Sequence, residues 1–225
     1  MKRSVSFFRS RRFSSFTLVE LLVVIAIIAI LAGVLFSAGS AAIAAAKRAK
    51  AANTATQIQT SVLNYYTEYS VYPVPSTTTT DYKLTDASSD GANWSALIYA
   101  LSGNINPYNG SATPAPSVTS FSNTRAIAFL NLKSSDVDKA NTLNAPLNPA
   151  QPNGGNPYFN IAIDSDYDGV LGTSPSAVTT MPNFASPTGT WQTGGGTTTS
   201  GVAVWANCNG NVTTQTNANF WVHTY

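Results

Sequence analysis

The sequence predicts an α+β fold in which one long N-terminal helix packs, by its second half, on a small antiparallel β-sheet. The helix is predicted because residues 16–36 are almost entirely apolar, and residues 37–70 are rich in alanine and contain no proline. The sheet is predicted because three short segments near the C-terminus are rich in β-branched and aromatic residues and are bounded by Gly, Asn or Asp. We expect four regions: a basic leader at 1–15, an apolar helix at 16–36, an amphipathic helix at 37–72 and a globular head at 73–225.

The apolar run from Phe16 to Phe36 has the properties of a membrane-spanning helix. Its 21 residues are enough to cross a hydrocarbon core about 30 Å thick. The leader before it holds five of the 12 basic residues and no acid, which keeps the N-terminus in the cytoplasm and predicts that the chain beyond residue 40 is exported. The alternatives are a secretory signal peptide cut near Ala38–Ala41 and a plain signal anchor.

Glu20 places a carboxylate near the start of this run. Twelve Leu, Val, Ile and Phe side chains follow it up to Phe36; they favour insertion by about 4–7 kcal/mol, against about 2.5–3.5 kcal/mol for an acid at mid-bilayer. We therefore expect insertion despite Glu20. Because a charge inside such a segment is expensive, it marks a candidate functional site. The alternative is an incidental polar residue at the membrane boundary.

The helix is predicted to continue well beyond the membrane. Apolar residues recur at spacings of three or four, which places them on one helical face: Ala55, Ile58, Val62, Tyr65 and Tyr69. The residue before a proline avoids the helical conformation, so we expect the helix to end at Val71-Tyr72-Pro73.

The head is predicted to contain a small sheet and no catalytic centre. The expected elements are strands at 158–163, 201–206 and 220–224, a short helix at Asn93–Leu101, and an ambiguous apolar segment at 125–132. Without its leader the chain keeps seven basic and ten acidic residues, which argues against a nucleic-acid-binding surface. Cys208 and His223 are single residues of their types, so neither an internal disulfide nor a Cys/His metal cluster can form. We expect no enzymatic activity.

A candidate metal site lies after the first of these strands. Asp164, Asp166 and Asp168 occur at alternate positions before Gly169, which resembles the start of a calcium loop, where oxygen ligands converge on a hard cation. An EF-hand would have Glu where this chain has Pro175, so the site is not an EF-hand. Asp and Gly are also common turn residues. A calcium site and a plain hairpin turn therefore both remain open.

The segment from Ser15 to Ile28 reads Ser-Phe-Thr-Leu-Val-Glu-Leu-Leu-Val-Val-Ile-Ala-Ile-Ile and closely resembles the prepilin cleavage and methylation motif of type IV pilins and type II secretion pseudopilins. The resemblance implies a pilin-like fold, cleavage between Ser15 and Phe16 by a prepilin peptidase, and methylation of the new Phe16 amine. It also implies that Glu20 meets the Phe16 amine of a neighbouring subunit. Ser15 stands where the family usually has glycine.

The function implied is that of a structural subunit of a type IV pilus-like or type II secretion pseudopilus filament. Implied partners are further pilin-like subunits, the peptidase, a membrane platform protein and an assembly ATPase. The chain would reside in the bacterial inner membrane, with its head in the periplasm, before it enters a filament. The alternatives are a minor pilin with an adhesive or DNA-uptake head, and an anchored binding domain unrelated to filaments.

Overall fold

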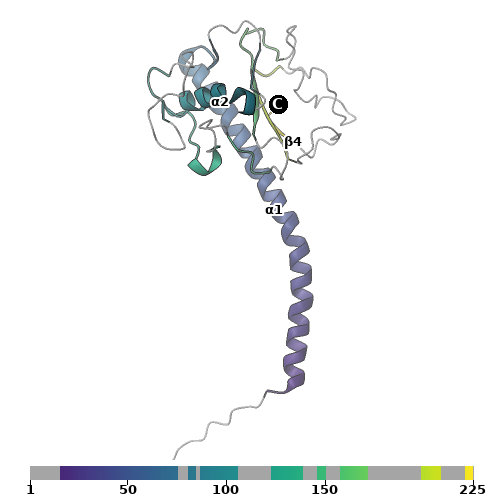
Figure 1. Cartoon of the computed structure of the whole chain (residues 1–225). Coiled ribbons are helices and arrows are strands. Elements are labelled where there is room, and N and C mark those ends of the chain that lie inside the picture. The colour runs from purple at the N-terminus through teal and green to yellow at the C-terminus, as the bar shows by residue number, and fades with distance from the viewer. Residues whose placement is uncertain are drawn as a thin grey trace, which may run out of the picture. The chain divides into compact units, whose positions relative to one another are not determined.

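A computed structural model describes residues 16–75, 81–84, 87–105, 123–138, 146–150, 158–171, 199–208 and 221–224. The elements in these ranges are α1 (Leu18–Tyr69), β1 (Tyr82–Leu84), α2 (Ala87–Leu101), a short 3₁₀ helix (Ser134–Asp136), β2 (Asn160–Ile163), β3 (Val202–Asn207) and β4 (Trp221–His223) (Figure 1). A long N-terminal helix and a small antiparallel sheet confirm the predicted α+β class. The chain divides into two compact units, Met1–Ile43 and Ala44–Tyr225, and each is described by itself.

Helix α1 confirms the prediction of one continuous helix. It spans 52 residues, from Leu18 to Tyr69, and its alanine-rich middle contains no proline. It ends at Ser70, whose φ of 56° is left-handed and so cannot continue a right-handed helix. The last helical residue, Tyr69, therefore lies four residues before Pro73, close to the predicted end.

A membrane-spanning helix was predicted at 16–36. Within the described residues, no helix meets the combined criteria of length and apolarity for crossing a bilayer. The predicted span is therefore not confirmed and stays a prediction.

The second half of α1 contributes one buried face to the main hydrophobic core. Its buried members are Ala51, Ala55, Ile58, Val62 and Tyr65. They share one cluster with residues of α2 (Trp94, Leu97, Ile98 and Leu101) and of the sheet (Leu84, Ile161, Ile163, Val202, Val204 and Ala206). A hydrogen bond also joins α1 to β3, because Gln59 Nε2 donates to the carbonyl oxygen of Val202 at 2.8 Å.

The four strands form one antiparallel sheet in the order β1-β2-β3-β4. Because side chains alternate between the faces of a strand, Ile161 and Ile163 join the main core. Ala162, Ala203, Trp205 and Leu171 form a second buried cluster. The sheet therefore buries side chains on both faces.

Comparison with the predicted elements shows three differences. Strand β1 was not predicted, since its three residues are too few to show a period of two. Helix α2 begins at Ala87, six residues before the predicted start. The ambiguous segment at 125–132 is neither a strand nor a helix, and pairs only through a single bridge between Ala128 and Ser102 in the described part.

The predicted strands at 158–163, 201–206 and 220–224 are confirmed as β2, β3 and β4; β2 and β4 are shorter than predicted, and β3 has the predicted length but begins and ends one residue later. Three expectations lie wholly or partly outside the described residues: the leader 1–15 with Ser15, residue Phe220, and Pro175.

Candidate functional sites

The start of α1 is a capping box formed by Thr17 and Glu20. The backbone N–H and the hydroxyl of Thr17 both donate to Glu20 Oε2, at 2.9 and 2.8 Å, and the Glu20 N–H lies 3.3 Å from Thr17 Oγ1. Thr17 is thus the N-cap residue and Glu20 the third helical residue, the spacing that satisfies two otherwise unpaired N–H groups. The pattern Thr-x-x-Glu before an apolar run could have been recognised in the sequence and was missed.

The predicted cleavage bond, between Ser15 and Phe16, coincides with the point where the described residues begin. Ser15 lies outside the described residues, whereas Phe16 precedes the first helical residue and its side chain is 71 % exposed. Glu20 follows one turn later, with its carboxylate bonded to Thr17. Of the predicted site residues of the N-terminal motif, the two that the structure describes, Phe16 and Glu20, therefore both lie at the start of α1.

The large apolar side chains after this turn are exposed along the first half of α1. From Leu18 to Leu31 their exposed fractions range from 45 to 78 %. Such a surface is far more apolar than that of an ordinary soluble monomer.

The second candidate site is created by the register of β1 and β2. Tyr82 pairs with Ile163, so the next antiparallel positions outward are Asp81 and Asp164. One carboxylate oxygen each of Asp81, Asp164 and Asp166 lies within 4.8 Å of the others. Two of the three predicted ligands, Asp164 and Asp166, are therefore brought together. Asp81 joins them from the segment before β1, and only strand register could have revealed it.

Asp168, the remaining predicted ligand, is not a member of this group. Its Oδ1 accepts a hydrogen bond from the Val170 N–H at 2.7 Å, which is the local turn contact expected of aspartate. Gly169 follows with a left-handed φ of 83°, and its N–H donates to Asp164 Oδ2 at 3.0 Å. The turn and the acid group therefore coexist in one loop.

Asp164 occupies the most confined position in the group. It is 4 % exposed, and its Oδ1 has no hydrogen-bond partner in the described structure. Burial raises the pKa of Asp164 above its usual value; the Gly169 N–H opposes this, and the hydrogen bond and charge of Asp166 add to the increase. A buried oxygen beside further carboxylates costs free energy unless a proton or a cation compensates it.

The same loop makes an aromatic contact with the end of α1. The ring of Tyr167 stacks on Tyr72 at a centroid distance of 5.5 Å, and Tyr72 stacks on Tyr66 at 4.5 Å. The Tyr72 N–H also donates to the hydroxyl oxygen of Tyr167 at 3.1 Å. The acid loop is therefore linked to both the sheet and the last turns of the helix.

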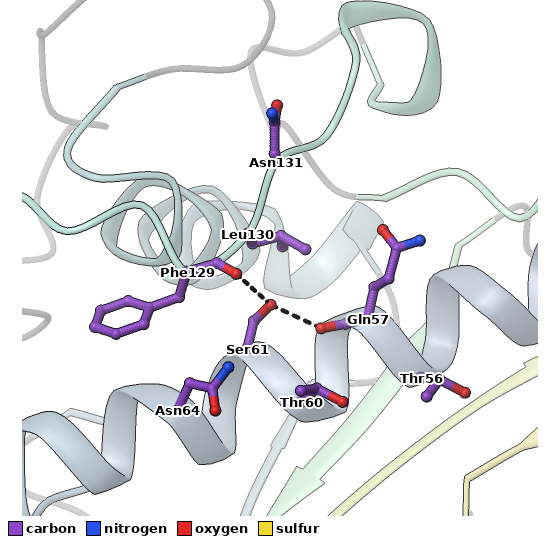
Figure 2. A pocket seen from close by; sticks show the side chains of 8 residues that line it. All are labelled: Thr56, Gln57, Thr60, Ser61, Asn64, Phe129, Leu130 and Asn131. Carbon is purple, nitrogen blue, oxygen red and sulfur yellow. Dashed lines mark hydrogen bonds between the residues drawn. The ribbon is translucent and has the colours of Figure 1, made fainter.

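An open groove of about 260 Å³ lies along α1 beside residues 129–131 (Figure 2). Its lining is Thr56, Gln57, Thr60, Ser61, Asn64, Phe129, Leu130 and Asn131. Figure 2 shows the Ser61 hydroxyl between the carbonyl oxygens of Gln57 and Phe129, at 2.7 and 2.9 Å. None of these lining residues is an acid, a base or a thiol, so the lining supplies no general base to activate its serine and threonine hydroxyls.

Comparison with known proteins supports a family assignment for the N-terminal segment alone. Neither a curated protein nor a solved structure matches the chain. The family model of the prokaryotic N-terminal methylation motif matches residues 10–36, the stretch that contains Ser15, Phe16 and the capping box. The chain thus carries the N-terminal methylation motif, the signature of type IV pilins and pseudopilins.

Proposed function

We propose that this protein is a structural subunit of a type IV pilus-like or type II secretion pseudopilus filament. The observation that carries the proposal is the methylation motif at residues 10–36, which includes the start of α1 and its exposed apolar side chains. A prepilin peptidase cuts between Ser15 and Phe16 and methylates the new amine. The subunit then assembles through α1.

The exposed side chains of the first half of α1 support this role. Apolar surface on this scale is removed from water either by lipid or by other apolar helices. In a pilin-like subunit, lipid covers this surface while the subunit resides in the bacterial inner membrane with its head in the periplasm. Other apolar helices cover it after the subunit enters the helical bundle of a filament. The expected partners are related subunits, the peptidase, a platform protein and an assembly ATPase.

Glu20 supplies the polar contact in this apolar assembly. Cleavage leaves a positive amine on Phe16, and a buried charge is tolerated when it is paired. The carboxylate of Glu20 in one subunit and the Phe16 amine of its neighbour form such a pair, which fixes the stagger between helices. The second half of α1 holds the head, through the buried face that includes Ile58 and Val62. The role is structural rather than enzymatic.

The first test is the N-terminus of the mature protein, measured by intact-mass and peptide mass spectrometry of protein from its native membrane. We expect a chain that begins with N-methylated Phe16. A start near Ala41 would show a released secreted domain, and an uncut Met1 would show a simple anchor. Each of these two results would overturn the filament proposal.

A further inference from the structure

The exposed side of the second half of α1 has no charged residue over most of its length. Between Lys50 and Glu68, every exposed side chain of this helix is neutral, and several are Thr or Asn. These two residues are poorer helix formers than Lys, Glu or Ala, so helix stability does not explain their presence. Charged residues are depleted at the core of protein–protein interfaces. The composition therefore favours a surface that another protein covers.

The groove beside residues 129–131 combines an apolar side with available polar groups. Figure 2 shows it between this segment and α1, and the ring of Phe129 supplies apolar surface. Four of the neutral side chains that line it form no hydrogen bond with any other described residue: Gln57, Thr60, Asn64 and Asn131. Tyrosine has an apolar ring and a polar hydroxyl, and is enriched at protein interfaces. A tyrosine side chain therefore matches both parts of the lining.

A patch of three tyrosines, Tyr66, Tyr72 and Tyr167, offers such side chains. Its two outer rings, Tyr66 and Tyr167, are 36 and 50 % exposed, and both stack on Tyr72. The φ of Tyr167 is 61°, a left-handed conformation that is rare and strained for a bulky residue. Backbone strain of this kind is found preferentially at functional sites. The strained residue that holds an exposed ring is therefore a candidate contact residue.

The groove and the tyrosine patch lie on different flanks of α1. On a helix with 3.6 residues per turn, Tyr66 points about 160° away from Asn64 and about 120° away from Thr60. One subunit can therefore use both surfaces at the same time. When two different surfaces of one molecule bind each other in successive copies, the contact is heterologous and produces a ring or an open helical polymer.

Residues beside the two surfaces carry opposite charges. Asp168 is exposed and directly follows Tyr167, whereas Lys133 is exposed and lies two residues beyond Asn131. Lys133 forms no ion pair with a described acid. Opposite charges at the rim of an interface fix its register and disfavour contacts between like surfaces. The charges thus favour binding of patch to groove over patch to patch or groove to groove.

We propose that the tyrosine patch of one subunit binds in the groove of a second copy of this chain. The acid rim at Asp168 then faces Lys133 of the next subunit, and the same contact repeats head to tail along the polymer. This inference rests on the proposed filament function. It adds a contact between heads to the assembly through the first half of α1.

Cross-linking of sheared filaments tests which surfaces meet. The full-length chain carries Cys208→Ala to remove its own thiol, together with Lys133→Cys and Asp168→Cys at the two rims, and is treated with a short bismaleimide. We expect a ladder of dimers, trimers and longer species on a denaturing gel. The matched controls carry only one of the two new cysteines and should remain monomers.

The other outcomes of this cross-linking separate the head contact from the filament itself. Filaments of the double variant that give no ladder would overturn the head contact alone. Dimers from a single-cysteine variant would show a contact between like surfaces and would also overturn it. Wild-type cells that process the chain to methylated Phe16 but form no polymer would overturn both the filament function and the head contact.

Substitutions of opposite charge at Thr60 test the groove without changing the fold. Thr60 is exposed, and Glu and Lys are both better helix formers than Thr, so neither variant should lower the Tm of the full-length chain in detergent. Thr60→Glu places a carboxylate against the acid rim of the neighbour and should reduce filament yield about tenfold or more. Thr60→Lys, the matched control, should reduce it less. An unchanged yield with Thr60→Glu, or equal losses with both variants, would overturn the proposal.

Discussion

The two halves of α1 contain similar apolar side chains but bury them differently. Between Leu18 and Leu31, large apolar side chains are exposed at positions all around the helix. In the second half, Ile58 and Val62 are fully buried while the neighbouring Leu63 is 39 % exposed. A periodic apolar stripe is covered within the subunit, whereas an apolar surface on all sides needs cover from other molecules. The spacing of the apolar residues therefore distinguishes the buried face of the second half, which we call the docking face, from the exposed apolar surface of the first half, which we call the assembly face.

The largest expected effect concerns Glu20, the charge in the first half. Glu20→Gln retains an oxygen for the capping box but has no charge to form an ion pair with an amine, and Glu20→Ala loses both functions. Because loss of one partner of a buried pair costs about 3–5 kcal/mol, both variants should reduce filament yield more than about tenfold, as counted by electron microscopy of sheared filaments. Membrane insertion, measured by fractionation, should not change. Normal filament yield with Glu20→Gln would leave Glu20 only its local capping role.

The next largest effect is expected when the same substitution, isoleucine to alanine, is made in each half of α1. Ile58→Ala creates a cavity in the core and should lower the free energy of unfolding by about 2–5 kcal/mol. Ile28→Ala, where the side chain is 59 % exposed, should leave the unfolding of the C-terminal unit unchanged. Urea unfolding in detergent, followed by tryptophan fluorescence, measures both. Equal destabilisation by the two variants would contradict the division between assembly face and docking face.

The smallest effect is expected at the ion pair between Lys50 and Asp136. Its atoms Nζ and Oδ1 are 2.8 Å apart, but the lysine side chain is 55 % exposed. Exposed pairs contribute about 0.2–1 kcal/mol and weaken with salt. Lys50→Ala should therefore destabilise the protein by less than about 1 kcal/mol, and the difference should vanish in high salt. A larger, salt-independent loss would indicate that the lysine stem packs on the core.

Much of the fold followed from local patterns in the sequence. The long helix was predictable because its alanine content and the spacing of Ile58, Val62 and Tyr65 are properties of neighbouring residues. Strands β2 and β3 were predictable because β-branched residues alternate within them. By contrast, β1 has three residues and forms a strand only through its pairing with β2.

The acid group of Asp81, Asp164 and Asp166 likewise combines residues that a local sequence pattern identifies with one that only the strand pairing identifies. Asp164 and Asp166 could be identified from spacing alone. Asp81 could not, because its place opposite Asp164 depends on the register that joins Tyr82 to Ile163. Asp168 looks equivalent to its neighbours in the sequence, yet its Oδ1 serves the turn. Alternate spacing predicted an acidic loop, and the pairing of strands determines which acids converge.

The capping box at the start of α1 has a thermodynamic consequence for a filament built from this subunit. Glu20 already accepts two hydrogen bonds from Thr17 in the isolated chain, so pairing with a neighbour's amine is an exchange of partners and not the rescue of a bare charge. The net gain per subunit is the difference between two satisfied states, which is smaller than the strength of the ion pair itself. A polymer joined by such exchanges can be dismantled subunit by subunit, because each departing carboxylate returns to its own Thr17.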